Sequence, residues 1–200
     1  MIDEGYVKYR SHWQEAPAQK APEATLLVHW RRPLYDAGLI GVLEDSGIGY
    51  GNISHRIGDT DRFLISGTQT GHLDALTEAH FAEVVDYDLE ANSVTARGPV
   101  APSSEAMTHA AIYHLDHSIR AVVHVHHHEM WLRFRDVLPT TDADVRYGTP
   151  DMAHEFRRLY AKTDFASRGI AVMAGHEDGI VGIGVSMQEA TERIITLLRS

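Results

Sequence analysis

The chain has 200 residues, 44% of them hydrophobic and 23% charged, and its formal net charge is −10 at pH 7. These values are typical of one folded domain, and the lack of cysteine excludes disulfides, thiolate metal sites and cysteine nucleophiles. The 18 Lys and Arg residues are scattered along the chain, which argues against a nucleic-acid partner. The sequence shows neither a signal peptide nor a membrane-spanning run, so we expect a cytoplasmic protein without a membrane partner.

Residues 1–22 combine prolines with mixed charge, and we expect them to form an irregular N-terminal arm of a single domain covering residues 1–200. Apolar residues recur at helical spacing over residues 23–35, where Pro33 predicts a kink or two short helices. A glycine run at 47–52 precedes a predicted hairpin of strands at 53–57 and 63–65.

The rest of the chain alternates irregularly between strand and helix signals. The further elements predicted, in order, are a short helix with a loop at 73–82, strands at 83–89 and 94–97, a helix at 105–115, a strand at 118–126, a mixed connection at 127–150, a helix at 151–162, strands at 170–174 and 180–185, and a final helix that a capping box of Ser186 and Glu189 begins. This order favours a layered α/β fold with a mixed, mainly antiparallel sheet.

A strand-like run at residues 121–126 carries two histidines at alternating positions. On a strand, His124 and His126 would project from one face, with Val123 and Val125 on the other. Two imidazoles side by side are half of a tetrahedral metal site. His176, in a glycine-flanked turn, and Glu105, in the first turn of a helix, are candidates for the third and fourth ligands, and Glu105 could also act as a base.

Two alternatives to this ligand set stay open. His126 and His128 have the same spacing as the first pair, although the apolar residues before His124 favour the pair at 124 and 126. His109 follows Glu105 by four residues, on the same helix face, and could be either a ligand or a buried histidine of the core.

Three short segments have the composition of an anion site. Ser103 and Ser104 precede the helix that starts at Glu105, so their hydroxyl groups and the free N–H groups of the helix could hold a phosphate. The dipeptide Gly51-Asn52 and the turn containing Thr68 and Gln69 could contribute further donors.

These motifs, taken in order, resemble the class II aldolase/adducin head family, which includes L-fuculose-1-phosphate aldolase and L-ribulose-5-phosphate 4-epimerase. The motifs that carry the resemblance are Gly51-Asn52-Ile53-Ser54, Phe63-Leu64-Ile65-Ser66-Gly67-Thr68, Pro102-Ser103-Ser104-Glu105, Val123-His124-Val125-His126 and His176. The resemblance covers about residues 25–198. It implies a three-layer α/β/α fold and, commonly, a homotetramer with active sites between subunits.

The resemblance also implies a function. It implies a lyase of the aldehyde-releasing type that cleaves a small phosphorylated sugar or hydroxy-ketone through a metal-stabilised enediolate. His124, His126 and His176 would bind Zn²⁺, or another divalent ion such as Mn²⁺, Co²⁺ or Fe²⁺. Glu105 would be both ligand and acid/base.

For the substrate, the resemblance implies that a separate group of residues holds the phosphate. These are Gly51, Asn52, Thr68, Gln69, Ser103 and Ser104. The tyrosine that the family carries after its His-x-His motif has no clear match in this chain, and Tyr147 lies near that position.

Two other functions remain compatible with the sequence. An epimerase, dehydratase or decarboxylase could use the same enediolate chemistry, although Glu at position 105, where the epimerases have Asp, favours aldol cleavage. A non-catalytic, adducin-like assembly domain is the other alternative, and the presence of all four candidate ligands argues against it.

Overall fold

The computed structural model describes residues 5–200. The strands, in chain order, are β1 (Arg10–Glu15), β2 (Gly41–Val42), β3 (Gly49–Tyr50), β4 (Asn52–Arg56), β5 (Phe63–Ser66), β6 (Phe81–Asp88), β7 (Ser93–Gly98), β8 (Ala121–His126), β9 (Ile170–Val172) and β10 (Gly179–Gly184). The helices are α1 (Pro22–Asp36), the 3₁₀ helix η1 (Glu78–His80), α2 (Ala106–Tyr113), α3 (His128–Phe134), α4 (Pro150–Lys162), α5 (Phe165–Arg168) and α6 (Met187–Leu198).

Within these residues, eight strands form a central sheet with the order β1-β7-β6-β5-β4-β8-β10-β9, and β2 and β3 form a separate ribbon. The edge strand β1 runs parallel to β7, and the other neighbours in the sheet are antiparallel. The predicted mixed, mainly antiparallel sheet is therefore confirmed.

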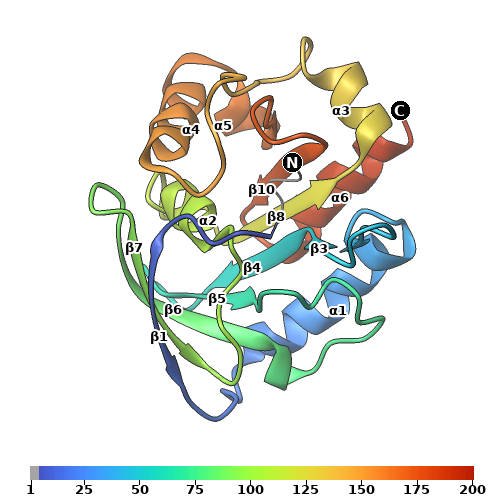
Figure 1. Ribbon diagram of the computed structural model, residues 1–200. Coiled ribbons are helices and arrows are strands. Elements are labelled where there is room, and N and C mark those ends of the chain that lie inside the picture. The colour runs from blue at the N-terminus through green and yellow to red at the C-terminus, as the bar shows by residue number, and fades with distance from the viewer. Residues whose placement is uncertain (1–4) are drawn as a thin grey trace.

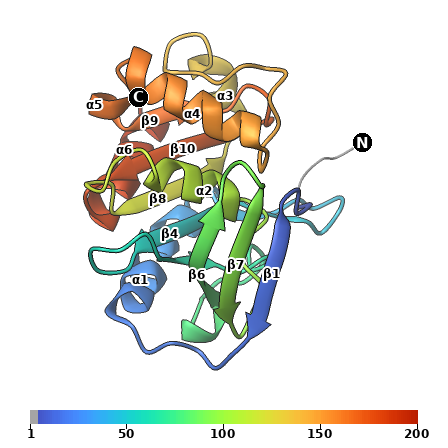
Figure 2. The same ribbon diagram turned by 90° about the vertical axis from the view of Figure 1, so that its left-hand side faces the viewer.

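Helices cover both faces of this sheet, as Figures 1 and 2 show. Helices α2, α4 and α5 share one hydrophobic core with the sheet, and α1 and α6 share the other. Strand β8 contributes Val122 to the first core, and Val123 and Val125 to the second. The α/β/α layering is thus built on the alternation of side chains along buried strands.

Several local predictions were wrong. The expected irregular arm contains the strand β1, which adds to the sheet edge beside β7, while its residues 1–4 lie outside the described part of the chain. Helix α1 continues through Pro33 as one helix. The mixed connection at 127–150 contains α3, and the glycine run contributes β3.

The capping box of the last helix is formed only in part. The Ser186 hydroxyl accepts a hydrogen bond from the Glu189 backbone N–H at 3.1 Å, as predicted. The Glu189 carboxylate accepts from the N–H of Val185, at 2.8 Å, instead of closing the box on Ser186. The Ser186 hydroxyl thus caps one unpaired N–H group of the helix start, and the Glu189 carboxylate holds the residue before the cap.

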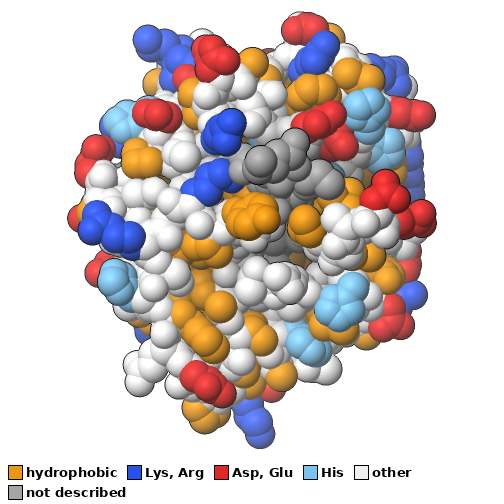
Figure 3. Space-filling model, in the orientation of Figure 1, with side chains coloured by type: hydrophobic (Ala, Val, Ile, Leu, Met, Phe, Trp, Pro, Cys, Tyr) orange, Lys and Arg blue, Asp and Glu red, His pale blue; other side chains and the backbone are white. Residues whose placement is uncertain are grey.

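The surface carries interspersed charges. On the face in Figure 3, acidic and basic side chains alternate around the rim and do not gather into one basic patch. Among residues 5–200, no helix has the length and apolar character needed to cross a bilayer.

We predict that Arg56 is a major stabilising residue of the fold. Its guanidinium is fully buried and donates to the carbonyls of Tyr113 (2.6 Å) and Ile119 (3.0 Å), which ties β4 to the segment after α2. Arg56→Met would leave buried carbonyls unpaired and should lower the free energy of unfolding by about 3 kcal/mol in urea denaturation. The control Arg32→Met removes an exposed pair with Asp36 and an exposed hydrogen bond to the carbonyl of Asp74, and should lower the free energy of unfolding far less. Equal losses in both variants would contradict this role.

Candidate metal centre

Three imidazoles converge at the end of β8. His124 and His126 come from that strand, and His176 comes from the turn between β9 and β10. The ring centroids of the three pairs lie 4.7 to 5.1 Å apart, and one nitrogen from each ring lies within 4.8 Å of the others. This spacing allows three nitrogens to share one ion.

The sheet register places these rings. His126 lies opposite Gly179 in the β8–β10 ladder, and a Cβ atom at position 179 would lie 3.3 Å from the His124 ring and 2.9 Å from the carbonyl oxygen of His176. Glycine at this position lets the rings pack against the neighbouring strand. Burial, followed by the neighbouring rings of His176 and His124, lowers the pKa of His126 well below its usual value. His126 is therefore neutral at pH 7, the form of imidazole that binds a metal.

Glu105, at the start of α2, reaches the same cluster. Its Oε1 lies 3.1 Å from Nδ1 of His176, and the residue is only 1% exposed. Burial alone would raise the pKa of Glu105, but the imidazoles of His176 and His124 lower it to about 2. The side chain is therefore a carboxylate at neutral pH.

The donor set fits a divalent transition metal. Within residues 5–200, the Glu105 carboxylate has the ion pair with His176 and a side-chain contact with Thr108, and neither oxygen has a hydrogen bond of good geometry. A buried carboxylate without such partners is unfavourable, and a cation would compensate for the missing bonds. Three imidazoles and one carboxylate are ligands that Zn²⁺ accepts, and Mn²⁺, Co²⁺ and Fe²⁺ bind the same types of ligand.

The structure also bears on the two alternatives left open by the sequence. The His109 ring is fully buried, and its Nδ1 forms a 2.7 Å hydrogen bond with the Ser54 hydroxyl, so it does not join the three-histidine group. Burial lowers the pKa of His109 to about 3, which keeps this core ring neutral. His128 lies apart from the three rings, with its Nδ1 2.7 Å from Asp178. The pair at 124 and 126 is the one that meets His176.

The six predicted phosphate-binding residues line one small pocket of polar groups and glycines, which we call the anion pocket. Its described lining consists of Gly5, Gly49, Gly51, Asn52, Gly67, Thr68, Gln69, Thr70, Gly71, Ser103 and Ser104. The predicted residues thus come together from three separate segments. Gly51 has a φ of +73°, and a Cβ atom there would lie 2.8 Å from the Ile40 side chain, so glycine is needed at this position.

Sequence reasoning missed Arg31, which supports the anion pocket from α1. Its guanidinium is buried and donates to the carbonyls of Gly71 (3.1 Å), Thr70 (3.3 Å) and Asp74 (3.3 Å). These bonds fix the turn that carries Thr68 and Gln69. A helical arginine gives no signal of this role in the sequence, because its partners are backbone carbonyls some 40 residues away.

Tyr147, which lies in the sequence near the position of the family's tyrosine, contacts the histidine cluster directly. Its buried ring stacks on His176, with centroids 4.3 Å apart and planes at 25°. The Lys8 ammonium lies over the same Tyr147 ring, 3.1 Å from its centroid. The tyrosine therefore limits how the His176 ring can turn.

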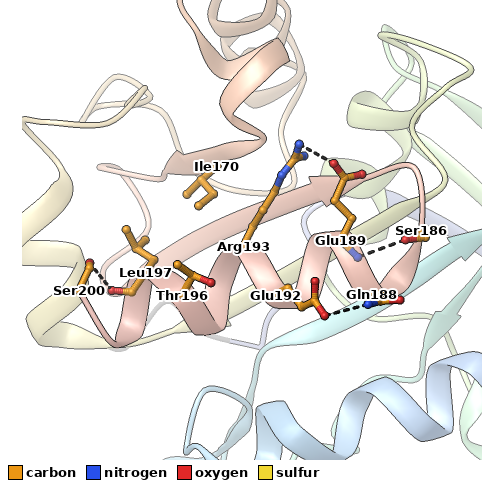
Figure 4. Close-up of a pocket in the computed structure, with 9 residues that line it drawn as sticks. All are labelled: Ile170, Ser186, Gln188, Glu189, Glu192, Arg193, Thr196, Leu197 and Ser200. Atoms are coloured by element: carbon orange, nitrogen blue, oxygen red, sulfur yellow. Dashed lines mark hydrogen bonds and ion pairs between the residues drawn. The ribbon is translucent and has the colours of Figure 1, made fainter.

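A much larger cavity lies elsewhere. It has a volume of about 610 Å³ and follows the outer face of α6, with Ile170 and Ser186 at its border (Figure 4). Its charged residues have partners within the lining: Arg193 pairs with Glu189, and the Gln188 amide donates to the Glu192 carboxylate. A second open hollow of about 420 Å³ borders the histidine cluster at His126. Of these two hollows, the second is the one that could admit a ligand to the cluster.

The sequence profile of the Class II Aldolase and Adducin N-terminal domain matches residues 45–200. The chain belongs to this family. Proteins of the class II aldolase family typically depend on a metal, in agreement with the candidate ligands found here. No protein with a curated description matches the sequence significantly.

Solved class II aldolase structures share the fold. L-Fuculose-1-phosphate aldolase from Thermus thermophilus superimposes with a TM-score of 0.62 at 20% identity, over 88% of this chain and 89% of that one. YgbL from Klebsiella pneumoniae, whose description names aldolase, epimerase and decarboxylase as alternatives, gives 0.65 at 20% identity, over 88% and 85%. The N-terminal class II aldolase domain of a conserved Thermoplasma acidophilum protein gives 0.62 at 16%, over 92% and 94%.

We predict that His124→Ala abolishes stoichiometric binding of a divalent ion, because it removes a central, fully buried nitrogen donor. Elemental analysis of the purified protein after incubation with Zn²⁺ measures this. The matched control is His117→Ala, an exposed histidine that belongs to neither group of candidate ligands, and this variant should bind as much metal as the unaltered chain. Unchanged metal content in His124→Ala would contradict the assignment of this residue as a ligand.

Proposed function

We propose that this protein is a metal-dependent lyase that cleaves a small phosphorylated sugar or hydroxy-ketone and releases an aldehyde. The observation that carries the proposal is that the anion pocket adjoins the histidine cluster along the chain and across the sheet. Ser103 and Ser104 line the pocket and Glu105 follows them directly. Asn52 also lines the pocket and lies opposite His124 in the β4–β8 ladder.

The anion pocket would hold the substrate phosphate. It combines the hydroxyl groups of Ser103, Ser104 and Thr68 with glycine-rich backbone, which allows close approach of N–H groups to an anion. A substrate anchored there by its phosphate would direct the carbon atoms beside the phosphate towards the imidazoles. This arrangement suits a short molecule whose carbonyl lies a few bonds from its phosphate.

His124, His126, His176 and Glu105 would hold the divalent ion. When bound, the ion supplies a Lewis acid that stabilises negative charge on the substrate's carbonyl oxygen. Because His126 is already neutral, its imidazole can bind the ion without first losing a proton. Tyr147 keeps His176 in orientation through ring stacking.

Glu105 would move the proton. In a retro-aldol cleavage, it would accept the proton of the hydroxyl group on the departing carbon while the carbon–carbon bond breaks. It would then return that proton to the carbon left beside the carbonyl, so that no proton is gained or lost overall.

We predict that Glu105→Gln lowers kcat by at least about 100-fold, because the amide can neither accept nor return this proton. Release of aldehyde from a panel of ketose 1-phosphates, with the zinc-loaded protein, provides the measurement. Glu192→Gln, on the exposed face of α6, is the matched control and should keep full activity.

The same panel separates the other functions. Conversion of a sugar phosphate to its epimer, or loss of water or carbon dioxide without aldehyde, would replace the lyase by an epimerase, dehydratase or decarboxylase. No turnover of any compound, with the ion bound, would favour a non-catalytic, adducin-like assembly domain. The homotetramer implied by the family resemblance stays a prediction, which the solution mass of the protein checks.

A further inference from the structure

Residues 5–9, which we call the strap, run along the wall of the candidate site before the chain enters β1. Gly5 lies in the lining of the anion pocket. At the other end of the strap, Tyr9 is buried, and its hydroxyl donates to the carbonyl of Ser103 at 2.8 Å. Ser103 itself lines the pocket. The strap is thus attached to the pocket at both of its ends.

The middle of the strap is attached to the histidine cluster through Tyr147. The backbone N–H of Tyr6 donates to the Tyr147 hydroxyl at 3.1 Å, and this hydroxyl donates back to the carbonyl of Tyr6, also at 3.1 Å. The Lys8 ammonium lies over the same ring, which stacks on His176. One tyrosine side chain therefore links the strap to a candidate metal ligand.

With the strap in this position, the anion pocket is too small for its proposed ligand. Its volume is about 20 Å³, which is room for roughly one water molecule. A phosphate group has five non-hydrogen atoms and needs several times this space. The pocket has the right polar groups but can accept the phosphate only after part of its wall has moved.

The strap is the part of that wall with the least support from secondary structure. The other lining segments are held by strands β3, β4 and β5, by the bonds from Arg31, or by the start of α2. The strap has neither helix nor strand. Its contacts with the site include the hydrogen bonds of Tyr6 and Tyr9 and the Lys8 contact described above.

We propose that the strap closes the anion pocket and is displaced when a phosphate group binds, so that it regulates access to the site. The proposal rests on the proposed function in that it assigns this pocket to phosphate. The strap-closed form binds no phosphate, and the apparent affinity is then reduced by the fraction of molecules with an open strap. Weakening the strap should therefore tighten phosphate binding.

The test is calorimetric titration of the full chain with inorganic phosphate. Tyr147→Phe removes both hydrogen bonds to Tyr6 and keeps the ring on His176, and Tyr9→Phe removes the bond to Ser103. Each variant should bind phosphate roughly three- to tenfold more tightly than the unaltered chain, the range expected for loss of one or two such bonds. The matched control is Tyr160→Phe, which removes a tyrosine hydrogen bond to Asp116 on α4's side of the fold and should change nothing.

Adding Ser104→Ala to Tyr147→Phe shows whether the phosphate sits in the anion pocket, in which case the gain in affinity should be lost. Hydrogen exchange adds a second readout, because phosphate should speed exchange of the strap's amides. Unchanged or weaker phosphate binding in both tyrosine variants overturns the strap proposal, even if Ser104→Ala proves that the pocket binds phosphate. Tighter binding in both variants, without turnover of any ketose phosphate, upholds the strap and removes the lyase function.

Discussion

The register of β8 between two antiparallel neighbours determines where the candidate metal centre lies. His124 is opposite Asn52 on one side and Val181 on the other, and both ladders fix the same alignment. A shift of β8 by one residue would turn His124 and His126 towards α1 and α6, and would place valines of the strand in the site instead. The geometry of the site is therefore fixed by backbone pairing, which is more rigid than any long side chain.

Buried charge distinguishes the site from the rest of the interior. Elsewhere, a buried ionic group has partners within the chain: the Glu83 side chain is 1% exposed and pairs with Arg62 at 3.0 Å and Arg97 at 2.8 Å. Glu105 is equally buried, but its ion pair is with the imidazole of His176, at 3.1 Å, and neither oxygen has a hydrogen bond of good geometry from the described residues. A cation bound beside this carboxylate would stabilise it, and an incompletely compensated buried charge is typical of functional sites.

The parts that the sequence could predict are those encoded by local spacing. Alternation along β8 predicted that His124 and His126 share a face, and the serines before Glu105 predicted one wall of the anion pocket. The parts that it could not predict depend on distant partners. Strand β1 forms only because β7 offers an open edge, and its own residues are all exposed, so no apolar pattern marks it. Arg31 looks like a surface residue of a helix, but it lies beneath a turn.

The attachment of the first described residues to late parts of the chain has a consequence for synthesis. Tyr9 bonds a residue 94 positions later, and Tyr6 bonds one 141 positions later. During synthesis, residues 5–9 can dock only after these later partners have been made, because such long-range contacts form last. Until β1 arrives, β7 presents an open strand edge that can pair with another nascent chain. Residues 5–15 are thus synthesised before the partners that order them, and their docking also closes the open edge of the sheet.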